Sequence, residues 1–165
     1  MIYFTSDQHF RHKNIIKYCE RPFATIDDME TAIIKRYNKK VSPNDTVFFV
    51  GDFSLYIKME ELNYFLKNMH GFKILIKGNH DRLSRNKYLE AGFDEFCKTG
   101  VTLKYKNKSF YVTHRPRYLG AADYVICGHV HQIYKMRDNF INIGVDVWNF
   151  CPVGIEEIYQ LTQGE

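Results

Sequence analysis

The sequence lacks paired cysteines, a membrane-length apolar run and a strong excess of one charge. Its four cysteines are scattered without a Cys-x-x-Cys motif, which argues against a cysteine-rich zinc site or a thioredoxin-like redox pair. Such cysteine usage is typical of a reducing cytoplasm, where we expect the protein to work. No stretch approaches the roughly 20 apolar residues of a membrane span, and the N-terminal residues lack the features of a signal peptide. We therefore expect no membrane association.

The length and the charge of the chain further limit which class of protein it can be. At 165 residues, with 45% hydrophobic and 25% charged side chains, the composition fits one globular domain. The sequence contains no internal repeat, low-complexity tract or linker, so we expect a single domain over residues 1–165 without a cap domain. The formal net charge of +4 mildly favours anionic substrates. It falls short of a strong nucleic-acid-binding surface, and the sequence has no helix-turn-helix or zinc finger.

Short β-branched and aromatic runs alternate with longer amphipathic segments, which predicts an α/β domain. The expected strands are residues 2–6, 46–50, 72–76, 101–105, 109–113 and 124–127. The expected helices are residues 14–18, 27–40, 58–69 and 86–91. Segments 140–144 and 155–161 complete the sheet or form a helix that covers it.

One tetrapeptide, Gly78-Asn79-His80-Asp81, stands where the apolar run 72–76 ends. Such residues also form ordinary surface turns, so the tetrapeptide alone fits either a turn or a site. The same placement recurs after other predicted strands, at Asp7 and His9, Asp52, His114, and His129 and His131. Five of the seven histidines occupy these positions. Because open α/β sheets form ligand crevices beyond the carboxyl ends of their strands, we expect these side chains to meet there.

The types and spacing of these residues indicate metal binding. Along extended backbone, residues i and i+2 project to the same side. Two pairs have this spacing, namely Asp7 with His9 and His129 with His131. Imidazole, carboxylate and amide groups without thiolates suit Mn, Fe, Zn or Ni rather than a structural zinc site. The ligands are too many for one ion, so we expect two ions bridged by Asp52.

The chain resembles the calcineurin-like metallophosphoesterase superfamily in a five-part signature. The parts occur in the family's order as Asp7-Gln8-His9, Gly51-Asp52, Gly78-Asn79-His80-Asp81, His114 and Gly128-His129-Val130-His131. The start Ser-Asp-x-His-Phe and the tail Gly144-Val145-Asp146-Val147-Trp148 are similar to small single-domain bacterial and phage members described as predicted phosphoesterases. The resemblance implies a four-layer α/β/β/α sandwich of two mixed sheets flanked by helices.

The resemblance also implies a role for each motif residue. The first metal would be held by Asp7, His9, Asp52 and His131. The second metal would be held by Asp52, Asn79, His114 and His129. His80 would contact the phosphate and protonate the leaving oxygen, and Asp81 would orient the His80 ring. Two divalent ions are implied, with Mn²⁺ as the expected metal and Fe, Ni or Zn as alternatives.

The implied activity is hydrolysis of a phosphoester by a hydroxide that bridges the two metals. Short gaps between the motifs leave no room for a cap, so the site should be open. We expect phosphodiesters of nucleotide or nucleic-acid type as substrates, either small molecules or nucleic-acid ends. One alternative is a phosphomonoesterase or protein phosphatase. The other is a non-catalytic metal-binding interaction module, which predicts a broken motif position that the sequence does not show.

Four further residues are candidates for substrate contact, namely Arg82, Arg115, Arg117 and Trp148. Guanidinium groups beside the site can clamp a phosphate through two hydrogen bonds, and a solvated loop position is the alternative. Trp148 either stacks on a base or belongs to the core. His12 follows the first motif closely and either reaches the site or lies on a surface loop.

Overall fold

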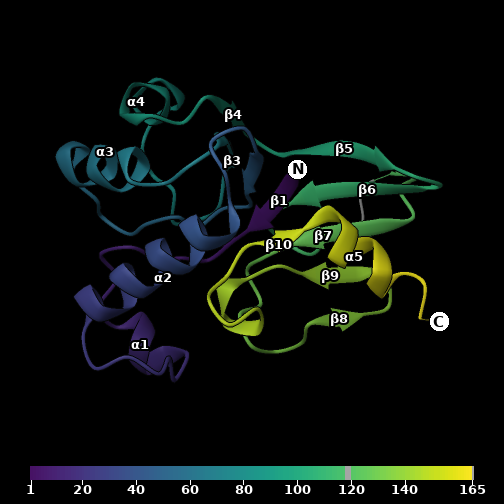
Figure 1. Ribbon diagram of the computed structural model, residues 1–165, viewed down its shortest axis with the longest axis horizontal. Coiled ribbons are helices and arrows are strands. Elements are labelled where there is room, and N and C mark those ends of the chain that lie inside the picture. The colour runs from purple at the N-terminus through teal and green to yellow at the C-terminus, as the bar shows by residue number, and fades with distance from the viewer. Residues whose placement is uncertain (118–119, 165) are drawn as a thin grey trace.

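The structure is a computed structural model that describes residues 1–117 and 120–164. Within this part of the chain, two five-stranded sheets pack face to face (Figure 1). Four helices cover the outer face of the first sheet. The expected α/β sandwich of two mixed sheets with flanking helices is confirmed.

The first sheet has the strand order β10-β1-β2-β3-β4 in the described residues. Its strands are β1 (Ile2–Thr5), β2 (Thr46–Phe49), β3 (Phe72–Ile76), β4 (Glu95–Cys97) and β10 (Val153–Gly154). β1 to β4 run parallel, and β10 pairs antiparallel with β1 at the edge. The carboxyl ends of the four parallel strands therefore lie along one edge of the sheet, where ligand sites form in such folds.

The second sheet has the order β5-β6-β7-β9-β8 over the described ranges. Its strands are β5 (Gly100–Tyr105), β6 (Lys108–Thr113), β7 (Tyr124–Cys127), β8 (Met136–Arg137) and β9 (Phe140–Asn142). The three central strands β6, β7 and β9 run parallel, and β5 and β8 are antiparallel edges. β5 and β6 form the hairpin that the sequence predicts.

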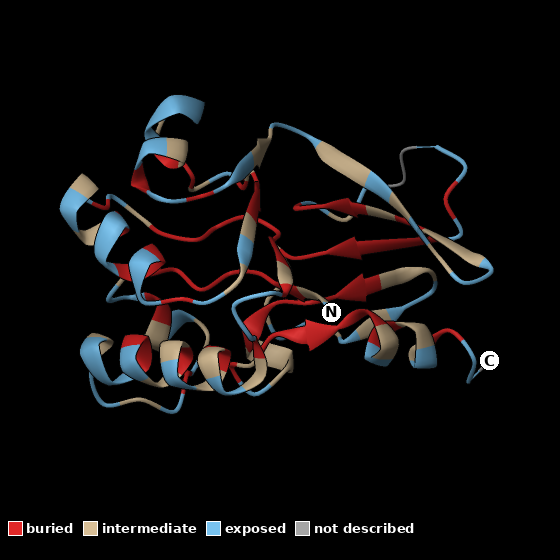
Figure 2. Cartoon of the chain, turned by 45° about the horizontal axis from the view of Figure 1, so that its top comes forward, coloured by how far each residue is buried: buried red, intermediate tan, exposed pale blue. Residues whose placement is uncertain are grey.

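Both faces of the first sheet are buried, because large apolar residues occupy both sides of its strands. Along β2, Val47 and Phe49 pack against the helices, whereas Phe48 faces the second sheet. The covering helices are α1 (Ile15–Tyr18), α2 (Ile26–Lys40), α3 (Met59–Lys67) and α4 (Arg85–Ala91). α5 (Ile155–Leu161) follows β10 and adds two isoleucines to the core between the sheets. Figure 2 shows buried strands between helices whose outer faces are exposed.

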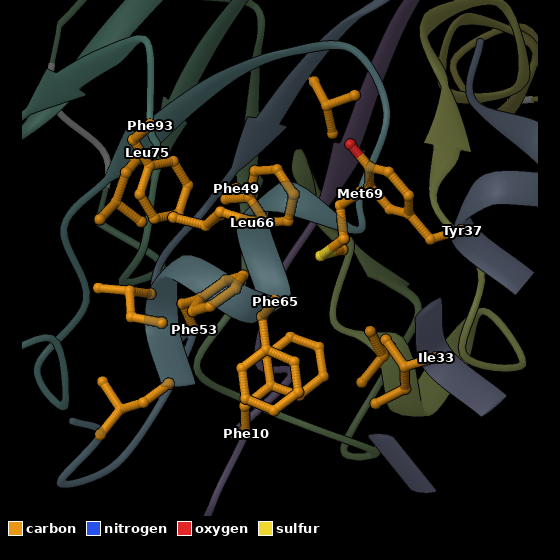
Figure 3. Packing of buried hydrophobic residues seen from close by; sticks show 14 of the residues in the cluster. Phe10, Ile33, Tyr37, Phe49, Phe53, Phe65, Leu66, Met69, Leu75 and Phe93 are labelled. Atoms are coloured by element: carbon orange, nitrogen blue, oxygen red, sulfur yellow. The ribbon is translucent and has the colours of Figure 1, made fainter. Parts of the chain in front are cut away.

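Aromatic packing under the helices fixes the loops that follow β1 and β2 (Figure 3). Phe10 stacks on Phe65 of α3 with ring centroids 4.4 Å apart and planes 13° apart. Phe53 meets Phe10 edge-on at 4.9 Å and Phe93 at 5.4 Å. Burying a side chain of this size stabilises a fold by roughly 1.5–3 kcal/mol. Because Phe10 and Phe53 each directly follow a predicted ligand, this core holds the ligand loops in place.

Some short elements differ from the sequence prediction. The strands β4, β8 and β10 have only two or three residues each and were not predicted. The segment 140–144 forms β9 and then leads to a 3-10 helix, η1 (Val145–Val147). The segment 155–161, for which strand and helix were both open, is the helix α5. Among the described helices, none is both long and apolar enough to cross a lipid bilayer.

Candidate metal centre

The predicted ligand segments converge where the two sheets meet. The backbone N–H of Asp7 donates to Gly51 O at 3.1 Å, which joins the loops after β1 and β2. The N–H of Gly128 donates to His114 O at 3.0 Å, which joins the loops after β6 and β7. A parallel bridge from Ser6 to Gly144 connects the two sheets. The chain therefore brings the five motifs to one place.

Five of the expected ligands have a left-handed backbone. Their φ values are 59° at Asp7, 55° at His9, 53° at Asp52, 71° at His129 and 46° at His131. We expected extended backbone at the paired motifs, and this expectation was wrong because the chain turns sharply as it leaves each strand. A non-glycine residue in this region costs on the order of 1–2 kcal/mol. Such strain is typical of functional sites, where surrounding contacts hold it in place.

A first cluster comprises Asp7, His9 and His131. One potential ligand atom from each lies within 4.8 Å of the other two. His9 Nε2 is 3.9 Å from Asp7 Oδ1, and the rings of His9 and His131 stack at 5.2 Å. The Asp7 carboxylate also accepts the N–H of His129 at 3.0 Å, which fixes its position. These three side chains form a compact set of nitrogen and oxygen donors.

A second cluster comprises Asp52, His114 and His129, whose ligand atoms also lie within 4.8 Å of one another. His114 Nε2 is 3.3 Å from Asp52 Oδ2 and 3.1 Å from Asn79 Oδ1. His129 and His131 thus belong to different clusters, although their spacing suggested a shared target. The family resemblance assigns Asp52, His114 and His129 to the second metal, and this assignment stays a prediction.

Asp52 lies between the two clusters. Its Oδ2 is 3.3 Å from His114 Nε2 in one cluster and 3.8 Å from His9 Nε2 in the other. Its Oδ1 accepts the backbone N–H of His80 at 2.8 Å, which holds the carboxylate in this orientation. One oxygen therefore faces both donor sets, which is the position that a bridging carboxylate requires.

The protonation of His9 and Asp52 fits divalent cations. Burial lowers the pKa of His9 to about 2, so its ring is neutral at pH 7. Its buried Nε2 has no hydrogen-bond partner in the described residues. Burial raises the pKa of Asp52, but the hydrogen bond and charge of His114 outweigh burial and lower it to about 2. Neutral imidazole and ionised carboxylate are the forms that bind metals.

The tautomer of His114 follows from its second nitrogen. Nδ1 donates to Val50 O at 2.9 Å, which leaves Nε2 to face the oxygens of Asp52 and Asn79. Burial lowers the pKa of His114, but the hydrogen bond that its ring donates to Asp52 and the charge of Asp7 outweigh burial and raise it. A positive charge is thus favoured near this nitrogen, and a bound metal cation is also positively charged.

His131 is held by an aspartate that the sequence analysis did not assign to the site. Its Nδ1 donates to Asp146 Oδ2 at 3.0 Å, and Arg21 pairs with the same carboxylate at 2.8 Å. Burial lowers the pKa of His131, but hydrogen bonds to Asp146 and Cys19 outweigh burial and raise it to about 10. Nothing in the local sequence marks Arg21, because its partner lies 125 residues away.

Asp81 has a different role from the expected one. We expected it to orient the His80 ring, but its carboxylate accepts three backbone N–H groups instead. The donors are Gly78 at 2.8 Å, Asp52 at 2.9 Å and Phe53 at 3.0 Å. The sequence interpretation was wrong because a carboxylate buried beside unpaired amides binds those amides first. Asp81 therefore shapes the loop that carries Asp52.

His80 faces the centre without an orienting carboxylate in the described residues. Its Nε2 lies 3.9 Å from Asp52 Oδ2, and its ring packs edge-on against His9 at 5.2 Å. Nδ1 is buried and has no hydrogen-bond partner in the described part of the chain. His12 also reaches the site, since its Nδ1 is 3.4 Å from His9 Nδ1. The sequence left two placements open for His12, at the site or on a surface loop, and the structure places it at the site.

Two glycines of the motifs allow the loops to approach this closely. A Cβ atom at Gly78 would collide with the backbone N of Asp52. A Cβ atom at Gly128 would collide with the side chains of Ser6 and Asp7. Any larger residue at either position would push a ligand loop away from the centre.

The four candidate substrate residues lie in different environments. Arg82 is exposed beside His80, with its Nη1 donating to Tyr56 OH at 2.9 Å. Arg115 and Arg117 are exposed and line a cavity that Asn79 and His114 also line. Trp148 packs against the core between the sheets and donates its indole N–H to Asn142 O at 2.8 Å. The structure thus gives Trp148 the core role rather than the base-stacking role.

Residues 1–152 match the calcineurin-like phosphoesterase superfamily domain. The chain therefore belongs to the calcineurin-like phosphoesterase superfamily. It is 32% identical over 173 residues to an uncharacterized protein of Methanocaldococcus jannaschii, with 98% of this chain and 91% of the relative covered.

The solved structures that are similar to this chain include the following two. A protein of unknown function from Aquifex aeolicus has a TM-score of 0.79 and 28% identity, with 98% of each chain covered. The Pseudomonas putida nuclease MPE has a TM-score of 0.52 and 18% identity, with 79% of this chain and 61% of the nuclease covered. At that identity, the second likeness concerns the fold alone.

Proposed function

We propose that the protein is a dinuclear metal-dependent phosphoesterase that hydrolyses phosphodiesters of nucleotide or nucleic-acid type. The observation that carries this proposal is the position of Asp52. Its Oδ2 lies 3.3 Å from His114 Nε2 and 3.8 Å from His9 Nε2, so two donor clusters share one carboxylate oxygen. A structural role alone does not explain why charged and polar donors face one another at this point.

The side chains fit two ions. Asp7, His9, Asp52 and His131 would hold the first, and Asp52, Asn79, His114 and His129 would hold the second. When bound, divalent cations at such sites make water a nucleophile near neutral pH and neutralise phosphoryl oxygens. Mn²⁺ is the proposed ion, and Fe, Ni and Zn suit the same donors.

The remaining roles belong to the protein side chains. His80 is partly exposed and faces the centre, so its Nε2–H can donate a proton to the departing ester oxygen. Arg82, Arg115 and Arg117 are exposed around the centre and are the proposed contacts to substrate phosphate. Asp81 holds the Asp52 loop through three backbone N–H groups and so keeps the bridging oxygen in position.

The preference for diesters rests on the openness of the site. The motifs span residues 7 to 131, and the segments between them are taken up by the strands and helices of the sandwich. We propose that the chain forms a single domain without a cap, which would leave space for a substrate that continues beyond the cleaved bond. The cysteines at 19, 97, 127 and 151 are free thiols, and we propose a cytoplasmic location on that ground.

Paired chromogenic reporters test the proposal. Chelator-treated protein is assayed with bis(p-nitrophenyl) phosphate and p-nitrophenyl phosphate while Mn²⁺, Ni²⁺, Zn²⁺ and Mg²⁺ are added back singly. We expect Mn²⁺ to restore cleavage of the diester more than that of the monoester. Preferential monoester cleavage would replace the diesterase with a phosphomonoesterase or protein phosphatase. Metal binding without cleavage of either reporter would favour the interaction module.

A further inference from the structure

A basic cavity of about 310 Å³ borders the second donor cluster. Four of the side chains that line it are cationic, namely Lys77, Lys98, Arg115 and Arg117. Asn79 and His114 belong to its lining and also to the second cluster. A group bound in this cavity would therefore lie directly beside the reacting centre.

The four cations come from three segments that the fold brings together. Lys77 directly follows β3 and Lys98 directly follows β4, and these strands are parallel neighbours. The N–H of Lys77 donates to Cys97 O at 2.9 Å, which places both lysines at the same sheet edge. Arg115 and Arg117 follow β6 of the second sheet. The cavity therefore lies where the edges of the two sheets meet.

A hydrogen bond connects the two sides of the cavity. Thr113 Oγ1 donates to Thr99 O at 3.0 Å, and both threonines line the cavity. Thr99 lies in the connection from β4 to β5, and Thr113 is the last residue of β6. This hydrogen bond joins the segment that carries Lys98 to the strand that precedes Arg115 and Arg117.

The charge of this cavity is not balanced by the protein. No acidic side chain lines it, and none of the four cations forms an ion pair within residues 1–117 and 120–164. Elsewhere, Arg21 pairs with Asp146, Lys40 with Glu157 and Lys106 with Glu156. Like charges held close together repel, and a polyvalent anion between them removes that repulsion.

We infer that this cavity is a subsite for a second phosphate group of the substrate, next to the phosphoester that is cleaved. The inference rests on the proposed function and makes the substrate class narrower. The preferred substrate is a nucleotide or oligonucleotide with at least two phosphate groups. Lysine ammonium and arginine guanidinium groups both bind phosphate strongly through charge-assisted hydrogen bonds.

A matched pair of reporters tests the subsite. One is the p-nitrophenyl ester of thymidine 5′-phosphate, and the other carries an additional 3′-phosphate. We expect the wild-type protein to favour the 3′-phosphorylated reporter about tenfold in kcat/KM. In the double variant Lys77→Gln/Lys98→Gln this ratio should fall close to one. The control Lys67→Gln/Lys87→Gln removes two exposed helix lysines and should keep the wild-type ratio.

Two results would overturn the subsite. The first is that the wild-type protein cleaves both reporters equally well. The second is that the cavity variant loses as much activity on the reporter without the 3′-phosphate as on the reporter with it. If neither reporter is cleaved, the proposed function fails. Binding of thymidine 3′,5′-bisphosphate to the metal-free protein then decides whether the cavity is a phosphate subsite. About tenfold weaker binding in the cavity variant than in the control variant supports the subsite. Equal binding by both variants excludes it.

Discussion

Arg21 and Asp146 form a buried ion pair through two hydrogen bonds, of 2.8 Å from Nε and 3.0 Å from Nη2. The same guanidinium donates to the carbonyl oxygens of Asp7 at 2.7 Å and Gln8 at 2.9 Å. Asp146 in turn accepts from His131 Nδ1 at 3.0 Å. One arginine thus positions two members of the first donor cluster, one through the backbone and the other through a carboxylate.

For Asp146→Asn we expect weaker metal binding at the first cluster by about 10–100-fold, the usual effect of losing a carboxylate behind a ligand histidine. The second cluster should keep its affinity, because His114 is oriented by Val50 instead. Calorimetric titration of metal-free protein with Mn²⁺ measures both affinities. Asp123→Asn, at an exposed aspartate, is the control. Equal weakening of both sites would show that Asp146 acts on the whole fold.

For Asp52→Asn we expect both ions to bind more weakly and turnover to fall to background. The amide oxygen can still accept the N–H of His80, so the fold should remain intact. Metal titration, activity assay and thermal unfolding of the same preparation measure the three effects. Near-normal activity in this variant would exclude the scheme with two ions and one bridging carboxylate.

For His80→Ala we expect both metals to remain bound and kcat to fall by roughly 10²–10⁴-fold, the size of a general-acid contribution. The loss should be larger for a diester with an alcohol leaving group than for a p-nitrophenyl ester, because nitrophenolate departs without a proton. His70→Ala is the control, since His70 lies outside the centre and bonds to Val41 O. Loss of bound metal would show that His80 is a ligand.

For Asp81→Asn we expect a loss of stability, because the amide group cannot accept all three N–H groups that the carboxylate accepts. A lost hydrogen bond to a buried charged group costs about 1.5–3 kcal/mol. Urea unfolding at pH 7 measures this loss, and turnover should fall as the Asp52 loop shifts. If Asp81 instead acted on the His80 ring, the variant would keep wild-type stability and lose only turnover.

Glu156 makes the stability of the fold depend on pH in the acidic range. Hydrogen bonds from Lys106, Tyr105 and Gln160 lower the pKa of Glu156 from 4.5 to about 2. Because the folded pKa is the lower one, this stabilisation is complete above pH 4.5 and is lost as the pH falls toward 2.

We therefore expect Glu156→Gln to lower Tm at pH 7 and to have a smaller effect at pH 3. Thermal unfolding of both proteins at the two pH values measures the difference. Glu90→Gln on α4 is the control, because Glu90 forms no ion pair in the described residues. A Tm difference that does not change with pH would show that the Glu156 carboxylate adds no ionic stabilisation.

The long strands and the polar residues at their ends were predictable, because burial imposes a pattern on each stretch separately. The strand Glu95–Cys97 was not, since three residues carry no recognisable alternation and its pairing depends on β3. The lysines at 77 and 98 could not be linked without that strand. Arg21 was missed for a related reason, because its contacts join segments far apart in the sequence.

The role of Asp81 shows a different limit. Its place in the motif suggested a side chain partner, yet its contacts are with main-chain amides, which are the same for every residue type. The left-handed turns at the ligands were also invisible, because aspartate and histidine adopt extended and left-handed backbone without any change in pattern. Residue type thus predicted which groups meet, whereas backbone geometry decided how they meet.

The left-handed backbone at the ligands lowers the stability of the fold at residues that the proposed activity requires. At Asp7, His9 and Asp52 the chain holds a conformation that glycine adopts without cost. Glycine substitutions there would relieve strain while removing the donors that define the centre. Selection for thermal stability alone would therefore favour replacement of these ligand residues. A directed-evolution experiment on this protein needs a screen for activity in every round.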